Sequence, residues 1–390
     1  MKIAKRLEKV SPSLTLEVTN LAKKLKDQGR AIVNFAGGEP DFDTPEHIKL
    51  AAIAAIKEGF TKYTPSSGTA QLKKAIAQKF LQDNHLSYTP EQIIVSCGAK
   101  HSIYNIILAL CEKGDEVIMG SPYWLSYPEM VALAEAKAKI VKTPLKKNFK
   151  LDKESLQRSI NKKSKLLILN SPSNPTGAVY TRDELKEIVE VVLRHNLYVI
   201  SDEIYEKLIY DGQEHVSCAS LGKEIFQRTI VVNGVSKSYA MTGWRIGYLA
   251  SPDKEIVNAI DTLQSHSTSN PCSISQKATL EALTTTDNTQ MQKMVQEFQS
   301  RRDILLQGLD AAKIPYVKPQ GAFYVFCNIA KTGLNSITFS RELLEQAEVA
   351  VIPGIAFGKD DYVRLSFSTS AEQIREGTRR IKDWLKSRNR

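Results

Sequence analysis

Residues 229–248 read TIVVNGVSKSYAMTGWRIGY, an apolar run that leads to Lys237 and, eight residues further on, to Arg245. The β-branched residues of 229–235 predict a strand, and the glycines on either side of Arg245 allow close approach of the backbone. Lysine forms imines with carbonyl compounds, and the planar arginine side chain binds phosphate well. The stretch therefore predicts a strand that ends at a lysine placed for imine chemistry, beside an arginine placed for phosphate. Most lysines are solvated surface groups, so this interpretation depends on the rest of the chain.

Strand-like runs alternate with helical patterns through the middle of the chain. Such runs occupy residues 93–97, 116–119, 166–170, 198–202 and 229–235. This alternation predicts an α/β fold with a mainly parallel sheet flanked by helices. Ligands bind such open sheets at the carboxyl ends of the strands, so the residues that follow each strand are the first candidates for a site.

Two helices carry clear end signals. The first is expected to have Thr44 as N-cap and Gly59 at its end, and its apolar face is expected to contain Ile48, Ala52, Ala55 and Ile56. The second is expected from about Thr181 to His195, because Thr181 and Glu184 have capping-box spacing.

The pattern changes near residue 290, where a long polar helix begins. Strands are expected after it, at 323–327, 349–352 and 362–367. We therefore expect three parts: an N-terminal segment, 1–44, that joins a small domain; a large domain, 45–289; and the small α+β domain itself, 290–390.

The bulk composition is that of a globular protein, with 42% hydrophobic and 25% charged residues. The net charge of +10 is spread along the chain, so it favours anionic ligands over nucleic acid. No apolar run is long enough to span a membrane, and the N-terminus lacks a signal-peptide pattern. The five cysteines and six histidines show neither a disulfide framework nor metal-ligand spacing. We expect a cytoplasmic protein with no metal, membrane or nucleic-acid partner.

Small residues and an amide follow two of the predicted strands. Ala99 and Lys100 lie between the strand 93–97 and a helical pattern, where free N–H groups favour a phosphate and an ordinary tight turn is the alternative. Asn174 lies in SPSNPTG, residues 171–177, after another strand. Its amide is a good donor to an oxyanion, although the prolines and glycine equally fit a rigid connector.

A carboxylate and an arginine complete the candidates. Asp202 ends the strand 198–202, where it is either a site residue or a helix N-cap. Arg364 lies inside an apolar strand pattern, so its guanidinium needs an anionic partner. Either a carboxylate ligand or an internal salt bridge meets that need.

Each feature is ambiguous alone, but together and in this chain order they resemble the fold type I, class I pyridoxal-phosphate-dependent aminotransferases. The resemblance runs from GGEPDFDTP at residues 37–45 to Arg364. It is strongest to the bacterial subgroup that includes thermophilic aspartate aminotransferases, through SPYW at 121–124 and MTGWR at 241–245. The resemblance implies a mainly parallel seven-stranded sheet flanked by helices, with a smaller α+β domain.

The resemblance also implies roles toward the cofactor, pyridoxal 5'-phosphate. Lys237 would bind it covalently and act as general base, and Asp202 would keep its pyridine nitrogen protonated. Asn174 and Tyr205 would hydrogen-bond its 3′ oxygen, and Trp124 would stack on its ring. The residues implied for its phosphate are Ala99, Lys100, Arg245 and, from a neighbouring subunit, Tyr63.

For the substrate, the resemblance implies that Arg364 clamps the α-carboxylate, with support from the Gly38 backbone and Asn174. The role of Tyr63 implies a homodimer with shared active sites. Other aspartate aminotransferases hold the distal carboxylate with a partner-subunit arginine, but this chain has no arginine between Arg245 and Arg301. The similar bacterial subgroup has a lysine at the position of Lys100. The resemblance therefore implies that Lys100 and Trp124 belong to the substrate site, and that Lys100 serves the distal carboxylate instead.

These residues favour aspartate or glutamate as amino donor and 2-oxoglutarate or oxaloacetate as acceptor, in a ping-pong reaction. The alternatives are an aromatic, kynurenine or prephenate-type broad-specificity aminotransferase, or a β-lyase with the same cofactor. Ser11 stands where prephenate-using members have a lysine, which weighs mildly against prephenate. A sensor domain of a transcription regulator is disfavoured, because the segment before Gly37 is too short for a DNA-binding domain.

In relatives, the peptide bonds before Pro122 and Pro175 are often cis, which the sequence alone does not reveal.

Overall fold

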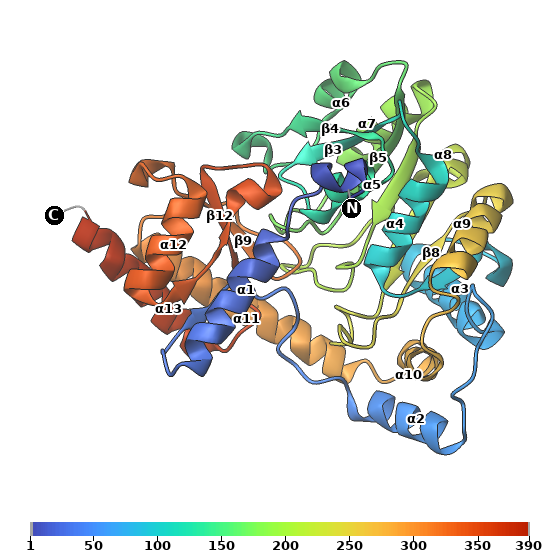
Figure 1. The fold of residues 1–390 in the computed structure, drawn as a ribbon, viewed down its shortest axis with the longest axis horizontal. Coiled ribbons are helices and arrows are strands. Elements are labelled where there is room, and N and C mark those ends of the chain that lie inside the picture. Colours follow the sequence, from blue (N-terminus) through green and yellow to red (C-terminus); the bar gives the residue numbers. More distant parts are fainter. Residues whose placement is uncertain (1–2, 389–390) are drawn as a thin grey trace.

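The computed structural model describes residues 3–388, and its centre is a seven-stranded sheet (Figure 1). Across the sheet the order is β2 (Ile93–Ser96), β8 (Gly247–Ala250), β7 (Thr229–Gly234), β6 (Tyr198–Asp202), β5 (Ser164–Asn170), β3 (Glu116–Ser121) and β4 (Lys137–Lys142). All neighbouring strands are parallel except β8, which is antiparallel to β2 and β7. The predicted α/β fold with a mainly parallel sheet is confirmed.

Helices cover both faces of this sheet, because the strands carry apolar side chains on both sides. One face packs against α4 (Ala99–Leu110), α5 (Ser126–Leu133) and α9 (Lys254–Ser267). The other face is covered by α3 (Ala70–Asn84), α6 (Lys153–Ser159), α7 (Arg182–Arg194), α8 (Lys223–Arg228) and α10 (Ser273–Thr284). Helix α2 (Glu46–Lys57) packs against α10. Among residues 3–388, no helix is both long and apolar enough to cross a membrane.

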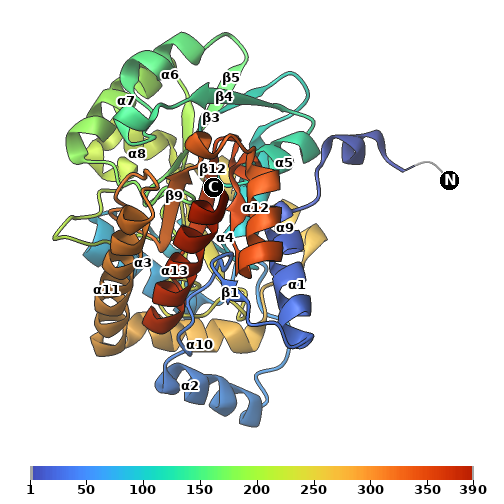
Figure 2. The same cartoon turned by 90° about the vertical axis from the view of Figure 1, so that its left-hand side faces the viewer.

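A second, smaller group of elements forms its own core. An antiparallel sheet has the order β11 (Ile352–Pro353), β12 (Tyr362–Ser366) and β9 (Tyr324–Asn328), and β1 (Val33–Asn34) pairs in parallel with β10 (Val349–Ala350). The helices here are α1 (Leu14–Asp27), α11 (Thr289–Ala311), α12 (Ser336–Ala347) and α13 (Ala371–Arg388). In Figure 2, α13 lies between α11 and α12. The β1–β10 pair joins the N-terminal segment to this group, while the expected domain boundaries stay a prediction, with residues 1–2 and 389–390 outside the described ones.

Short 3-10 helices occur in the connections. They are η1 (Lys5–Lys9), η2 (Pro90–Gln92), η3 (Leu145–Lys147), η4 (Cys218–Leu221), η5 (Ala330–Thr332) and η6 (Gly354–Phe357).

Two details of α2 differ from the sequence prediction. Its N-cap is Pro45 rather than Thr44, because the Thr44 hydroxyl makes tertiary contacts: it donates to the Ala240 carbonyl and accepts from the Trp244 indole. Ile56, expected on the buried face, is 53% exposed. The capping box of Thr181 and Glu184 on α7 is present as predicted.

Candidate active site

The candidate residues converge where β2, β5, β6 and β7 end and β8 begins. Asp202 is the last residue of β6, and Lys237 follows β7 within three residues. The Asn170 amide at the end of β5 donates to the Asp202 carbonyl at 3.0 Å, and its oxygen accepts from the Asn174 backbone at 2.8 Å. The sheet edge thus brings together side chains that lie far apart in the sequence, as the sequence predicted.

The start of α4 forms an anion site with Arg245. Gly98 has φ +88°, and a Cβ there would lie 2.6 Å from a terminal nitrogen of Arg245. A Cβ on Gly247 would lie 2.1 Å from the Ala99 nitrogen, so β8 begins directly against this turn. The first N–H groups of a helix, here those of Ala99 and Lys100, have no partner within the helix. A guanidinium and free N–H groups therefore face the same space, as a phosphate site requires.

Lys237 is enclosed among other charges. Its ammonium donates to the Gly38 carbonyl at 2.6 Å. Burial lowers the pKa of Lys237 to about 8, with Arg245 and Arg364 acting in the same direction and Glu39 and Asp202 opposing them. A lysine with such a lowered pKa loses its proton readily near neutral pH, which is what a nucleophilic amine needs.

Asp202 is 4% exposed, and its carboxylate accepts two hydrogen bonds. The Tyr127 hydroxyl donates to Oδ2 at 2.5 Å, and the Ile204 backbone donates to Oδ1 at 3.3 Å. Burial raises the pKa of Asp202 to about 6, against the effect of the Tyr127 hydrogen bond. The carboxylate is therefore suited to a cationic ligand that would favour its ionised form.

Arg364 is 2% exposed and has only neutral partners. Its guanidinium donates to the Asn174 side-chain oxygen and to the Ala36 carbonyl, each at 3.1 Å. Its Nε has no hydrogen-bond partner in the described part of the chain, and no carboxylate of residues 3–388 forms a salt bridge with it. The internal salt bridge considered for Arg364 is thus not found there, and a carboxylate ligand would supply the missing anion.

Tyr205 meets a residue that the sequence did not single out. Its hydroxyl lies 3.0 Å from the Tyr324 hydroxyl, and the Arg364 guanidinium lies over the Tyr324 ring at 4.3 Å. Tyr324 therefore connects two candidate site residues. It lies in the apolar strand β9, where no sequence signal distinguishes it from a core tyrosine.

Trp124 lies between Lys100 and Tyr127. The Lys100 ammonium is 5.1 Å from the centre of the Trp124 ring, and the Tyr127 ring meets Trp124 edge-on at 5.2 Å. Burial, followed by the charge of Arg245, lowers the pKa of Lys100. Tyr127 was also missed, since its place in the first turn of a helix after Trp124 is the only sequence signal.

Two other predictions concern Tyr63 and the prolines. Tyr63 is 90% exposed, so its side chain is not enclosed by its own chain. The peptide bonds before Pro122 and Pro175 are cis, as is the bond before Pro172.

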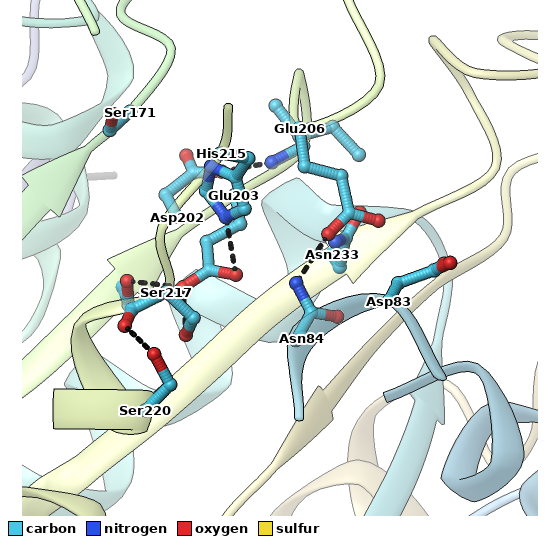
Figure 3. Close-up of polar contacts among 12 residues, drawn as sticks. Asp83, Asn84, Ser171, Asp202, Glu203, Glu206, His215, Ser217, Ser220 and Asn233 are labelled. Atoms are coloured by element: carbon cyan, nitrogen blue, oxygen red, sulfur yellow. Dashed lines mark hydrogen bonds and ion pairs between the residues drawn. The ribbon is translucent and has the colours of Figure 1, made fainter. Parts of the chain in front are cut away.

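A buried polar cluster lies behind Asp202 (Figure 3). The ligand atoms of Glu203, Glu206 and His215 lie within 4.8 Å of one another, close enough to hold a metal ion, although no sequence spacing suggested one. Each carboxylate oxygen already has a protein partner, and these are His215, Ser201 and Ser217 for Glu203 and Asn84 and Lys79 for Glu206. Burial lowers the pKa of His215, but Glu203 and Glu206 outweigh it and raise the pKa overall. The two carboxylates are thus satisfied by protein groups, while Nδ1 of His215 has no hydrogen-bond partner within residues 3–388. The cluster supports the turn from Asp202 to Glu206 from behind.

Comparisons with known proteins agree with this geometry. A family model described as "Aminotransferase class I and II" matches residues 30–381. The aspartate aminotransferase of Geobacillus stearothermophilus is 46% identical and covers 100% of both chains. A probable aspartate/prephenate aminotransferase of Rickettsia bellii is 46% identical over 97% of this chain and 98% of its own. The solved structure of the Thermus thermophilus aspartate aminotransferase with maleate has a TM-score of 0.95 at 42% identity, covering 98% of this chain and 99% of that one. This chain therefore belongs to the family of class I and II aminotransferases, with the fold type I architecture that its sequence predicted.

Proposed function

We propose that this aminotransferase moves the amino group of aspartate or glutamate to 2-oxoglutarate or oxaloacetate by a ping-pong mechanism. The observation that carries the proposal is Arg364, which is buried with neutral partners only in residues 3–388. An α-carboxylate fits this position as a bidentate ligand. Full-length relatives that are named aspartate aminotransferases support the choice of substrate.

The cofactor of this family is pyridoxal 5'-phosphate, and the site fits it. Its phosphate would be held by Arg245 and the N–H groups of Ala99 and Lys100, where glycines leave room for it. Asp202 would pair with its pyridine nitrogen, Asn174 and Tyr205 would contact its 3′ oxygen, and Trp124 would cover its ring. When bound, the cofactor supplies an electron-withdrawing ring for the electrons released at the substrate Cα.

The residues of this chain would then bind, orient and move a proton. Arg364 and Asn174 hold the α-carboxylate, which fixes the direction of the Cα–H bond. Lys237 takes the Cα proton with its amine, and the lowered pKa of Lys237 makes that amine available near neutral pH. Gly38 holds the Lys237 ammonium when it is protonated, through its carbonyl oxygen.

We propose Lys100 as the residue that recognises the distal carboxylate. Its ammonium lies over Trp124, beside the substrate position, while only its backbone is needed at the phosphate. In Lys100→Ser, we expect kcat/KM for aspartate to fall about 10–100-fold, because one charge-assisted contact is lost. The value for an apolar amino acid is expected to fall much less.

Steady-state kinetics with both donors tests this expectation, and Lys223→Ser, an exposed lysine on α8, is the control. Equal losses for the two donors would remove Lys100 from the recognition of the distal carboxylate.

A second candidate is an aspartate/prephenate or aromatic specificity. Several relatives with 42–46% identity are named as aspartate/prephenate aminotransferases, although Ser11 stands where the resemblance expects a lysine in prephenate users. A panel of amino donors and 2-oxo acids, including prephenate, separates these specificities, and release of pyruvate from a β-substituted donor identifies a β-lyase.

We also propose a homodimer in which Tyr63 reaches the phosphate site of a second copy. Tyr63 is 90% exposed, and the nearby helix α2 exposes Leu50, Ile53 and Ile56. An apolar helix face of this kind is typical of an interface.

A cytoplasmic location is proposed as well, because all five cysteines are free.

A further inference from the structure

We propose that Tyr127 is a positioning residue for the cofactor, because its hydroxyl holds the Asp202 carboxylate at the place where the pyridine nitrogen would bind. The proposal rests on the proposed role of Asp202. The proposal goes further, because Tyr127 is buried and is not among the residues that would contact the cofactor. It assigns Tyr127 a function in the recognition of the ring nitrogen.

The contact with Asp202 is short and isolated from water. The Tyr127 hydroxyl lies 2.5 Å from Oδ2 of Asp202, and the two residues are 2% and 4% exposed. Within residues 3–388, Tyr127 is the side chain that donates to this carboxylate, while the Ile204 backbone serves the other oxygen. A carboxylate has about four lone-pair sites, so a position remains for a protonated ring nitrogen.

The direction of the effect follows from charge. A hydroxyl that donates to an ionised carboxylate stabilises the ionised form, and an ionised Asp202 is the form that pairs with a pyridinium. Burial alone acts in the opposite direction and raises the pKa of Asp202. Without the Tyr127 hydroxyl, Asp202 would therefore be neutral over a wider pH range and would bind the ring nitrogen less strongly.

Tyr127 also contacts the other cofactor-facing residue nearby. Its ring meets Trp124 edge-on at 5.2 Å, and its backbone N–H donates to the Trp124 carbonyl at 3.0 Å. Tyr127 thus orients Asp202 with its hydroxyl and supports Trp124 with its ring. Since Tyr127→Phe keeps the ring and removes the hydroxyl, it isolates the first contact.

The test compares two ligands of the cofactor-free protein. One is pyridoxal phosphate, and the other is its analogue in which C–H replaces the pyridine nitrogen. Dissociation constants from fluorescence titration are measured for the unsubstituted protein, Tyr127→Phe and a control, Tyr210→Phe. Tyr210 is equally buried, and its hydroxyl donates to the Ala322 carbonyl instead. Circular dichroism confirms that each variant is folded.

We expect Tyr127→Phe to weaken pyridoxal phosphate binding about tenfold, the value of one hydrogen bond to a charged group, and to leave the analogue unchanged. Tyr210→Phe is expected to leave the preference between the two ligands unchanged. Equal weakening of both ligands in Tyr127→Phe, or no weakening, overturns the role of Tyr127. If the unsubstituted protein binds both ligands equally, the role of Asp202 fails as well, so the two failures are distinguishable.

Discussion

At the residue scale, burial brings the pKa values of Lys237 and Asp202 closer together. It lowers the pKa of Lys237 to about 8 and raises the pKa of Asp202 to about 6. In both cases the low-polarity surroundings disfavour the charged form. The lysine thereby gains a usable free amine near neutral pH, and the carboxylate gains a strong preference for a cationic partner.

Lys237→Ala is expected to abolish transamination without loss of the fold. The methyl group can neither bind the cofactor covalently nor take the proton, and loss of a general base alone lowers rates by about 10²–10⁴. Turnover with aspartate and the circular dichroism spectrum are the measurements. Lys277→Ala, a lysine on α10 outside the site, serves as control. Near-normal turnover in Lys237→Ala would contradict the mechanism.

Asp202→Asn is expected to stabilise the cofactor-free protein at pH 8 but not at pH 4. The folded pKa of Asp202, about 6, lies above its ordinary value of 3.8, so the folded state binds the proton more tightly. The penalty for burying the ionised form is therefore full above pH 6, falls as the pH drops, and vanishes below 3.8. A shift of this size corresponds to roughly 3 kcal/mol.

Thermal unfolding of both proteins at several pH values measures this difference. The control is Asp183→Asn, where the side chain is 89% exposed. A stability gain for Asp202→Asn that is independent of pH would show that burial of charge is not its cause.

The positions of several candidate residues were predictable, because these residues end or follow predicted strands. A strand pattern with a polar side chain at or after its end was enough to predict the positions of Lys237, Asp202 and Asn174. Tyr127 and Tyr324 lie inside apolar patterns, where a tyrosine that donates to a carboxylate resembles a core tyrosine. Only the folded chain brings them to Asp202 and Tyr205.

At the scale of elements, one ion pair connects α11 to the loop after β6. Arg302 is fully buried, and it donates two hydrogen bonds of 2.8 Å to Asp211 and one of 3.1 Å to the Pro319 carbonyl. The Arg302 hydrogen bonds lower the pKa of Asp211 to about 2. This bidentate pair fixes where the smaller group of elements meets the large sheet, next to the site.

Arg302→Ala is expected to destabilise the protein by about 2–3 kcal/mol, because it leaves a buried cavity and removes the bidentate partner of Asp211, which keeps only its ion pair with Lys318. Chemical denaturation measures the change. Arg379→Ala is the matched control: Arg379 is 60% exposed and pairs with Glu376 and Asp383, so its loss is expected to cost less than about 1 kcal/mol. Similar losses of unfolding free energy in the two variants would show that the ion pair of Arg302 with Asp211 stabilises the protein no more than an exposed ion pair does.

Strands with an uninterrupted apolar run were predicted, including the four-residue β2, and strands with a broken pattern were missed. The sequence indicated β5, β6 and β7, but β8 has four residues and begins with a glycine. In β4, lysines interrupt the apolar pattern. Residues 349–352 were predicted as one strand, yet they belong to two sheets, β10 and β11, on either side of Val351. Whether such a segment forms a strand depends on the strands that it pairs with, and the local sequence does not encode those partners.

At the scale of the whole molecule, Ile53→Asp is expected to yield a monomer with weakened cofactor binding. Ile53 is 45% exposed on α2, and a carboxylate there would lose its water on dimerisation. Light scattering measures the mass, and fluorescence titration measures the affinity for pyridoxal phosphate. Ile337→Asp, a 52% exposed isoleucine on α12, is the control. A dimer of unchanged stability in Ile53→Asp would exclude this face of α2 from the interface.

One of the two edge strands of the large sheet, β4, carries several lysines. Among residues 3–388, β4 has a neighbouring strand on one side only, and its sequence is KAKIVK, with lysines at positions 137, 139 and 142. A free strand edge is a template on which another chain can add a strand, and aggregation begins in this way. Side chains alternate along a strand, so Lys137 and Lys139 lie on one face of β4 and Lys142 on the other. An incoming backbone would therefore meet ammonium groups on both faces, and these would lose water as it pairs. The lysines of β4 therefore protect the folded protein from edge-to-edge polymerisation.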